Sequence, residues 1–174
     1  ARAVANSGAD YMLFISDATN DASMARSMAN TGYKLKFAEY ITGYGSNFVE
    51  LAGNAAEGTT SWIPNLPDED GNTTPGQTLY HKWFAYVAPD LRPDIFSAAA
   101  WASMEAFMTS LKSLKGPITR NGVVDGLRAI GKFDANGLLG PVSFGAKQNL
   151  GCEIAMQVKG GKWVRLHPAK GFAC

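Results

Sequence analysis

The sequence has few of the residues, and none of the short motifs, that mark the common catalytic and cofactor sites. It contains only two histidines and two cysteines. It lacks the phosphate-binding patterns GxGxxG and GxxxxGK, the zinc-protease pattern HExxH, the thiol pair CxxC and the nucleophile pattern GxSxG. With so few histidines and no thiol pair at ligand spacing, we expect no transition-metal site. We therefore expect no cofactor and no enzymatic activity, because no nucleophile is paired with a base.

An excess of one charge and a long hydrophobic run are also missing. The 16 basic and 15 acidic residues give a net charge of +1, and the basic residues are scattered. There is no glycine-aromatic segment of the RNA-binding type, so we expect no nucleic-acid partner. No apolar stretch approaches the roughly 20 residues that cross a bilayer. Apolar residues make up 46% and charged residues 18%, as in globular proteins.

The two cysteines bracket a hairpin-like segment near the end of the sequence. A disulfide between Cys152 and Cys174 would pin that segment, and it would require an oxidising compartment. Closing a loop of this length contributes about 3 kcal/mol in the chain-entropy model. The alternative is two unrelated buried thiols. The disulfide interpretation favours an exported protein.

The first third of the sequence reads as strands that alternate with helices. Residues 11–15 (YMLFI) form a continuous apolar run, typical of a strand buried on both faces of a parallel sheet. We expect further strands over residues 35–40 and 57–63. The helix after the first strand is expected to be capped by Asn20 or Asp21 and to end at Gly32. Parallel α/β sheets bind small ligands at the carboxyl ends of their strands, so the loops there are the candidate site.

Three helices and a hairpin are predicted in the remainder, and the third helix is a shorter one that begins at Thr119. The first helix starts at Thr74–Pro75, with Leu79, Trp83 and Val87 as its buried stripe. The second runs over residues 94–115, and its periodicity predicts a buried apolar face. That face comprises Phe96, Ala100, Met104, Phe107, Met108, Leu111 and Leu114. Alternation around Gly160–Gly161 predicts a C-terminal β-hairpin with a tight turn.

Four side chains at element ends are candidate ligand contacts. Asp17 follows the first strand, where it either receives an ammonium or hydroxyl group or serves as a helix cap. Tyr40 ends the second strand and offers a stacking face and a hydroxyl group. Tyr44 either contacts the ligand or covers the core. Phe96 stands at the start of the long helix, and a helix N-terminus that faces a cleft is a natural place for ligand contact.

Several segments resemble, in the right order, one known family. GADYMLFISDATNDASMARSMANTGYKLKF is similar to the strand-helix-strand segment of type I periplasmic binding proteins, in particular the branched-chain amino-acid (Leu/Ile/Val) receptors of ABC transporters. LAGNAAEGTTSWIP resembles the segment before a lobe crossing. The stretches AAAWASMEAFMTSLKSL, ITRNGVVDGLRAI and FDANGLLGPVSFG resemble the later helices and turn.

The resemblance implies two Rossmann-like lobes that are joined by three crossings and close on a ligand. It implies that this chain is only the C-terminal half of such a receptor. Residues 1–64 would be part of the C-terminal lobe, residues 65–150 part of the N-terminal lobe, and residues 151–174 a return to the C-terminal lobe. The long helix would then lack the sheet it covers, and we expect an exposed apolar face unless the missing N-terminal portion of the same protein, or a second copy, covers it.

The resemblance also implies a set of ligand contacts. These map onto Ser16, Asp17 and Ala18 after the first strand, onto Tyr40, Ile41 and Tyr44 after the second, and onto Phe96. Ile41 stands where amino-acid binders of this group often carry an acidic residue. The ligand is therefore expected to be an amino acid held through Asp17, or a small aromatic or aliphatic carboxylate without an amine.

The function implied is that of an extracytoplasmic solute receptor, in the periplasm or as a cell-surface lipoprotein. It would deliver a small-molecule ligand to the membrane permease of an ABC transporter and perform no chemistry. The alternative is a ligand-sensing domain of a regulator or receptor with the same fold. Because the sequence begins without Met in what reads as the end of a helix, we interpret it as a fragment or a processed product.

Overall fold

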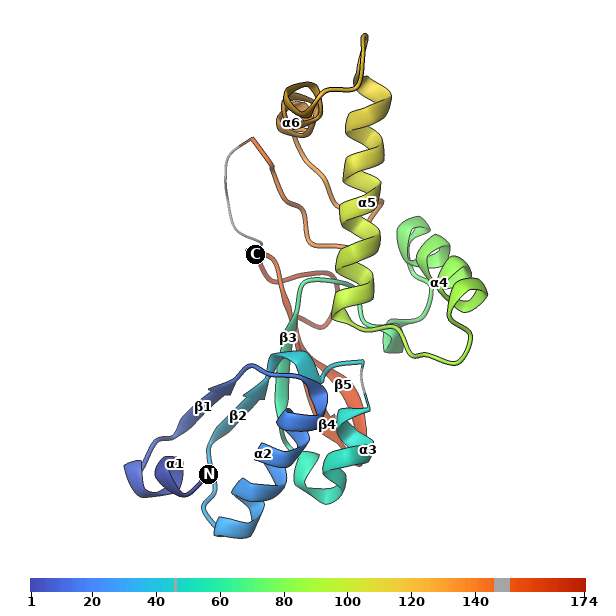
Figure 1. Ribbon diagram of the computed structural model, residues 1–174. Helices are drawn as coiled ribbons and strands as arrows, with labels where there is room; N and C mark the ends of the chain where they lie inside the picture. The colour runs from blue at the N-terminus through green and yellow to red at the C-terminus, as the bar shows by residue number, and fades with distance from the viewer. Residues whose placement is uncertain (46, 146–150) are drawn as a thin grey trace. The chain divides into compact units, whose positions relative to one another are not determined.

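The computed structural model describes residues 1–45, 47–145 and 151–174, and these fall into two compact units (Figure 1). Unit 1 comprises Ala1–Ile63 and Ile154–Lys170, and unit 2 comprises Pro64–Glu153 and Gly171–Cys174. The chain therefore passes from one unit to the other three times.

The C-terminal segment is shared between the two units. We expected all of residues 151–174 to return to the C-terminal lobe; in the structure Ile154–Lys170 belong to unit 1, and residues 151–153 and Gly171–Cys174 belong to unit 2. The reason is that Ala173 pairs with Glu153 and that Cys174 is disulfide-bonded to Cys152. The predicted disulfide is thus confirmed. Which lobe of a complete receptor each unit represents stays a prediction.

Unit 1 is built on a five-stranded sheet in the order β1-β2-β3-β4-β5. The strands are β1 (Tyr11–Phe14), β2 (Phe37–Tyr40), β3 (Thr60–Ile63), β4 (Ile154–Lys159) and β5 (Lys162–His167). The first three are parallel, and β4 and β5 are antiparallel to their neighbours. Gly160 and Gly161 have φ values of 58° and 72°, which suit the tight turn of the predicted hairpin. The predicted α/β class with a C-terminal hairpin is confirmed.

Helices precede and connect the parallel strands of unit 1. They are α1 (Arg2–Ser7), α2 (Ala18–Thr31) and α3 (Phe48–Ala52), with the single turns η1 (Ile41–Gly43) and η2 (Gly53–Ala56). Helix α2 packs against α3 and η2. Met12 of β1 is buried, whereas Tyr11 and Leu13, which point to the opposite face, are about half exposed. The expectation that this strand is buried on both faces is therefore wrong for the described residues.

Unit 2 is mainly helical. It contains η3 (Asp68–Asp70), α4 (Pro75–Val87), α5 (Ile95–Ser113) and α6 (Arg120–Ala129), and Figure 1 shows α5 as the longest helix. Thr74, Asp94 and Thr119 are the N-cap residues of α4, α5 and α6, and each accepts a hydrogen bond from a backbone N–H of the first turn. The predicted starts of α4 and α5 are thus confirmed.

A turn over residues 134–139 holds the start of α4 against the segment that enters unit 2. The backbone N–H of Gly76 donates to the carbonyl of Asn136 at 3.0 Å, and that of Leu66 donates to the carbonyl of Leu138 at 2.8 Å. Ala135 and Leu138 of the turn are buried with Tyr80 in the hydrophobic core of this unit.

The buried face of α5 is not the predicted one. Ala98, Ala102, Ala106 and Ser110 are buried, whereas Phe96, Met104, Phe107 and Met108 are exposed. Small side chains let α6 approach closely, and Ser110 donates a hydrogen bond to the carbonyl of Val123 at 2.7 Å. The predicted stripe of α4, Leu79, Trp83 and Val87, is exposed as well. An exposed apolar face on these helices agrees with the expectation that the sheet they cover is missing.

Candidate functional site

The proposed ligand loops leave the sheet at one edge, because β1 and β2 are parallel and end in register. Phe14 pairs with Tyr40, so Ser16 and Ile41 follow at neighbouring strand ends. Ser61 of β3 donates a hydrogen bond to the carbonyl of Ile41 at 2.9 Å. The loops after the first two strands are thus adjacent, as parallel topology requires.

Asp17 is the N-cap of α2. Its Oδ1 accepts hydrogen bonds from the backbone N–H groups of Thr19 and Asn20 at 2.9 and 3.1 Å, and its Oδ2 accepts one from Asn20 Nδ2 at 2.6 Å. The backbone bond from Asn20 is the main cause that lowers the pKa of Asp17. The expected caps, Asn20 or Asp21, are wrong. The cap alternative for Asp17 is confirmed, and a contact to a ligand stays a prediction.

Two residues that the sequence analysis did not assign to the site join the two loops. Thr42 Oγ1 lies within hydrogen-bond distance of the Ser16 carbonyl and 2.5 Å from Asp21 Oδ2. Asp21 has no exposed surface, and its Oδ1 has no partner among the described residues. Burial raises the pKa of the Asp21 carboxyl and the charge of Asp17 adds to the rise, whereas hydrogen bonds from Thr42 and the Ser16 backbone oppose it. The sequence offered one signal for this contact, an acidic residue, Asp21, in the first turn of a helix. Its partner, Thr42, lies 21 residues further along the chain.

The two predicted tyrosines lie in the core beneath the loops. Tyr40 and Tyr44 are each only 1% exposed. The Tyr40 ring packs against Phe14 and Phe48 with centroids 6.2 and 5.2 Å apart, and Tyr44 packs edge-on against Trp163 at 5.7 Å. Burial raises the pKa of Tyr40 well above its ordinary value, and the charge of Asp21 contributes. Both rings support the loops, and neither presents a face to solvent in unit 1.

The remaining predicted residues are more accessible. Ser16, Ala18 and Ile41 are half-buried and Asp17 is exposed. A polar groove of about 900 Å³ runs along α2 on its α1 side, and Ser16 is the predicted residue that lines it. Phe96 is 61% exposed in the first turn of α5 and belongs to unit 2. Six of the seven predicted residues thus belong to unit 1, at the end of β2 or on the segments that follow β1 and β2, and Phe96 belongs to unit 2.

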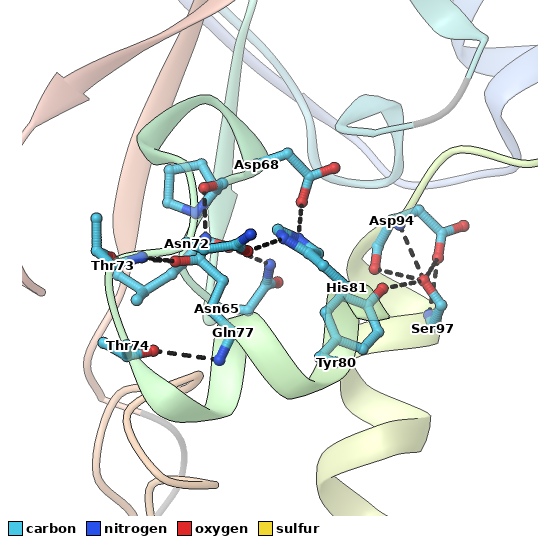
Figure 2. Close-up of polar contacts among 12 residues, drawn as sticks. Asn65, Asp68, Asn72, Thr73, Thr74, Gln77, Tyr80, His81, Asp94 and Ser97 are labelled. Carbon is cyan, nitrogen blue, oxygen red and sulfur yellow. Dashed lines mark hydrogen bonds and ion pairs between the residues drawn. The ribbon is translucent and has the colours of Figure 1, made fainter. Parts of the chain in front are cut away.

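A polar network in unit 2 surrounds His81 and the start of α5 (Figure 2). His81 Nε2 lies 2.9 Å from Asp68 Oδ1, and His81 Nδ1 lies 2.6 Å from Asn72 Oδ1. Burial raises the pKa of Asp68, and its contacts with His81 oppose the rise. Both ring nitrogens of His81 therefore lie within hydrogen-bond distance of a side-chain oxygen.

The second half of this network fixes the start of α5. Tyr80 Oη and Ser97 Oγ lie 2.7 Å apart, and Ser97 also completes a capping box with Asp94. No group of three potential metal ligands occurs among the described residues. No described helix combines the length and apolar character that a membrane crossing requires.

Comparisons with known proteins agree with this geometry. A family model described as periplasmic binding protein matches residues 1–162. A comparison with curated protein sequences found no match.

Solved structures resemble the chain over most of its length. A substrate-binding protein of an ABC transporter from Aeropyrum pernix matches with a TM-score of 0.75 and 12% identity, covering 98% of this chain and 48% of that one. A branched-chain amino-acid ABC transporter protein from Thermus thermophilus, solved with bound valine, matches with a TM-score of 0.70 and 18% identity, covering 99% and 48%. A leucine-binding protein from Thermotoga maritima matches with a TM-score of 0.68 and 13% identity, covering 90% and 43%.

The chain spans less than half of the length of each of these structures. At such identities the likeness shows the fold. The resemblance and the fold class that were predicted from the sequence are confirmed.

Proposed function

The chain belongs to the periplasmic binding protein family, and from this we propose that it is part of an extracytoplasmic solute receptor of an ABC transporter. The ligand is a small amino acid or a related small carboxylate, bound between two lobes. The observation that carries the proposal is the pair of polar loops that leave β1 and β2 in register at one sheet edge. The three chain passages between the units are compatible with hinge closure around a ligand.

The proposed contacts fall into two groups. Ser16, Asp17, Ala18 and Ile41 are accessible enough to meet a ligand directly. Tyr40 and Tyr44 are buried, so they act by holding those loops in place. Phe96 supplies an apolar contact from the start of α5. The opposing surface comes from a preceding portion of the same protein, since the structural neighbours are about twice as long.

The proposal also includes the compartment in which the protein works and the partner to which it delivers the ligand. The Cys152–Cys174 disulfide suits an oxidising compartment outside the cytoplasm. The partner is the membrane permease that receives the ligand. The protein performs no chemistry, and the engaged nitrogens of His81 are consistent with that role.

A thermal-shift experiment on the full-length protein tests the proposal. Leucine, valine and their amine-free analogues 4-methylpentanoate and 3-methylbutanoate are the first ligands to screen. A ligand at a hundred times its Kd stabilises the native state by about 2.7 kcal/mol, which raises the melting temperature. Failure of every small amino acid and carboxylate to raise it would contradict the proposal.

A pair of substitutions on one helix locates the site. Ala18→Trp places a large ring at the first residue of α2, beside the proposed contacts, and is expected to abolish the ligand-induced shift. Ala29→Trp adds the same ring at an exposed position near the other end of α2 and is the matched control. Equal ligand-induced shifts in both variants would move the site away from this loop.

A further inference from the structure

The single hydroxyl proton of Thr42 lies between two possible acceptors. Thr42 Oγ1 contacts two oxygens, the carbonyl of Ser16 and Oδ2 of Asp21. A threonine hydroxyl has one proton, and a backbone carbonyl can only accept. If Thr42 donates to Ser16, the contact with Asp21 becomes a hydrogen bond only when Asp21 provides the second proton.

The surroundings of Asp21 favour the neutral acid. The side chain is fully buried and its Oδ1 has no partner among the described residues, so an ionised carboxylate would be poorly solvated. The backbone N–H groups of Thr19 and Asn20, which would stabilise an anion at this helix end, already donate to Asp17. Desolvation is the main cause that raises the pKa of Asp21, and it outweighs hydrogen bonds from the Thr42 hydroxyl and the Ser16 backbone, which would lower that pKa.

The charged groups near Asp21 give no counter-charge. Asp17 carries a negative charge at the start of the same helix, and it disfavours ionisation of Asp21. Arg26 donates to the carbonyl of Leu51, and Glu39 of β2 accepts a hydrogen bond from Tyr11. The remaining charged or titratable groups on elements packed against α2 are Arg2 of α1 and Glu50 of α3, which are exposed, and Tyr40 of β2, which is buried and neutral. No ion pair reaches Asp21 from the described residues.

We propose that Asp21 holds a proton in the folded protein and donates it to Thr42, which in turn donates to the carbonyl of Ser16. Asp21 is then a positioning residue, and this chain fastens the loop after β1 to the turn after β2. Loss of the proton turns the Thr42 hydroxyl toward Asp21 and releases Ser16. Because both loops belong to the proposed ligand site, ligand binding should weaken as the pH rises through the titration of Asp21. This last step rests on the proposed function.

Two experiments test the proton without any ligand. In the full-length protein, a carbon-13 NMR titration should show one Asp carboxyl, absent in Asp21→Asn, that titrates clearly above 3.8. The amide of Asp21→Asn donates permanently to Thr42. The unfolding constant of wild type relative to Asp21→Asn should therefore grow by about tenfold per pH unit within the titration window. Asp125→Asn, at an exposed acid of α6, is the control and should follow wild type. Titration of Asp21 at or below 3.8, or a profile of Asp21→Asn parallel to wild type, would overturn the proposal.

Variants of Thr42 decide the direction of the hydrogen bond. Thr42→Val removes the acceptor that favours the neutral acid, so the Asp21 titration should move to lower pH. Thr42→Ser keeps the hydroxyl and should leave it in place. A move to higher pH in Thr42→Val would mean that Thr42 donates to an ionised Asp21, and the proposal would be wrong.

Ligand binding is measured as a separate arm. The thermal shifts produced by leucine and 4-methylpentanoate should shrink with rising pH in wild type and stay constant in Asp21→Asn. A shift with the same pH dependence in both proteins would remove the link between the proton and the ligand. No shift with any amino acid or small carboxylate would instead overturn the proposed function, and the ligand-free titration would still decide the state of Asp21.

Discussion

Gly76 occupies a position where any side chain would collide with backbone. A Cβ at this residue would lie 2.0 Å from the carbonyl oxygen of Ala135 and 2.9 Å from that of Asn136. Ordinary contacts lie near 3.5 Å, so in Gly76→Ala the start of α4 and the 134–139 turn must separate by roughly 1 Å or more. Both oxygens belong to the backbone, so the collision cannot be relieved by rotation of a side chain.

The expected loss of stability combines three effects. Forcing an extra methyl group into packed backbone costs about 1–3 kcal/mol. The hydrogen bond from Gly76 to Asn136, 3.0 Å long, is weakened or lost, at a cost of about 1 kcal/mol. Alanine is favoured over glycine in a helix by about 1 kcal/mol, which offsets part of this. We expect Gly76→Ala to destabilise unit 2 by about 2 kcal/mol.

Urea denaturation of the full-length protein, followed by tryptophan fluorescence, measures the effect. A loss of about 2 kcal/mol should lower the midpoint of the unit 2 transition by roughly 1 M. Gly131→Ala is the matched control, because a Cβ there meets no atom within 4 Å and its backbone is not left-handed. Its midpoint should stay within the error of wild type. Equal midpoints for Gly76→Ala and Gly131→Ala would refute the reasoning.

Three further predictions follow from the described contacts. Reduction of the Cys152–Cys174 disulfide, or replacement of both cysteines by alanine, should lower the free energy of unfolding by about 3 kcal/mol. Denaturant unfolding with and without reductant measures this loss, and an unchanged unfolding midpoint would contradict it. Asp17→Ala should lower the melting temperature at neutral pH, and the difference from wild type should vanish as the pH falls below 3.8. The reason is that a lowered pKa stabilises the folded state only where the group is ionised. A pH-independent difference would show that the charge of Asp17 has no role. Residues 1–174 expressed alone should associate through the exposed faces of α4 and α5, and a monodisperse folded monomer in light scattering would contradict that.

Local signals in the sequence predicted the boundaries of several elements. Thr74, Asp94 and Gly32 mark helix ends because capping depends on residues within one turn. Gly160–Gly161 predicted the hairpin for a similar reason, since the turn needs left-handed backbone at adjacent positions. Such features require no knowledge of distant partners.

The buried face of α5 could not be predicted in the same way. Its periodicity singled out Phe96, Met104 and Phe107, yet the described structure buries the alanines at 98, 102 and 106. Hydrophobic periodicity identifies the most apolar face of a helix. Which face is buried depends on the elements that pack against the helix, and periodicity does not identify those elements. Tyr80 and the 134–139 turn cover Ala98 and Ala102, α6 lies against Ser110, and Phe96, Met104 and Phe107 keep 41–61% of their surface exposed.

The arrangement of the loops that carry the proposed site could be predicted from the sequence, whereas the contacts within these loops could not. Parallel topology correctly brought Ser16 and Ile41 to one sheet edge. The roles of Asp21 and Thr42 were missed because a hydrogen bond between residues far apart in sequence leaves no local pattern. Tyr40 was expected to present a stacking face, but the aromatic cluster around Phe48 encloses it.

The two chain segments that lead into and out of the C-terminal hairpin are joined to each other within unit 2. Glu153 and Ala173 exchange two backbone hydrogen bonds, at 2.8 and 2.9 Å, and the neighbouring cysteines are covalently joined. Residues 154–170 therefore leave unit 2 and return to it as a loop that is closed at its base. The covalent bond keeps this base closed even when the two hydrogen bonds break.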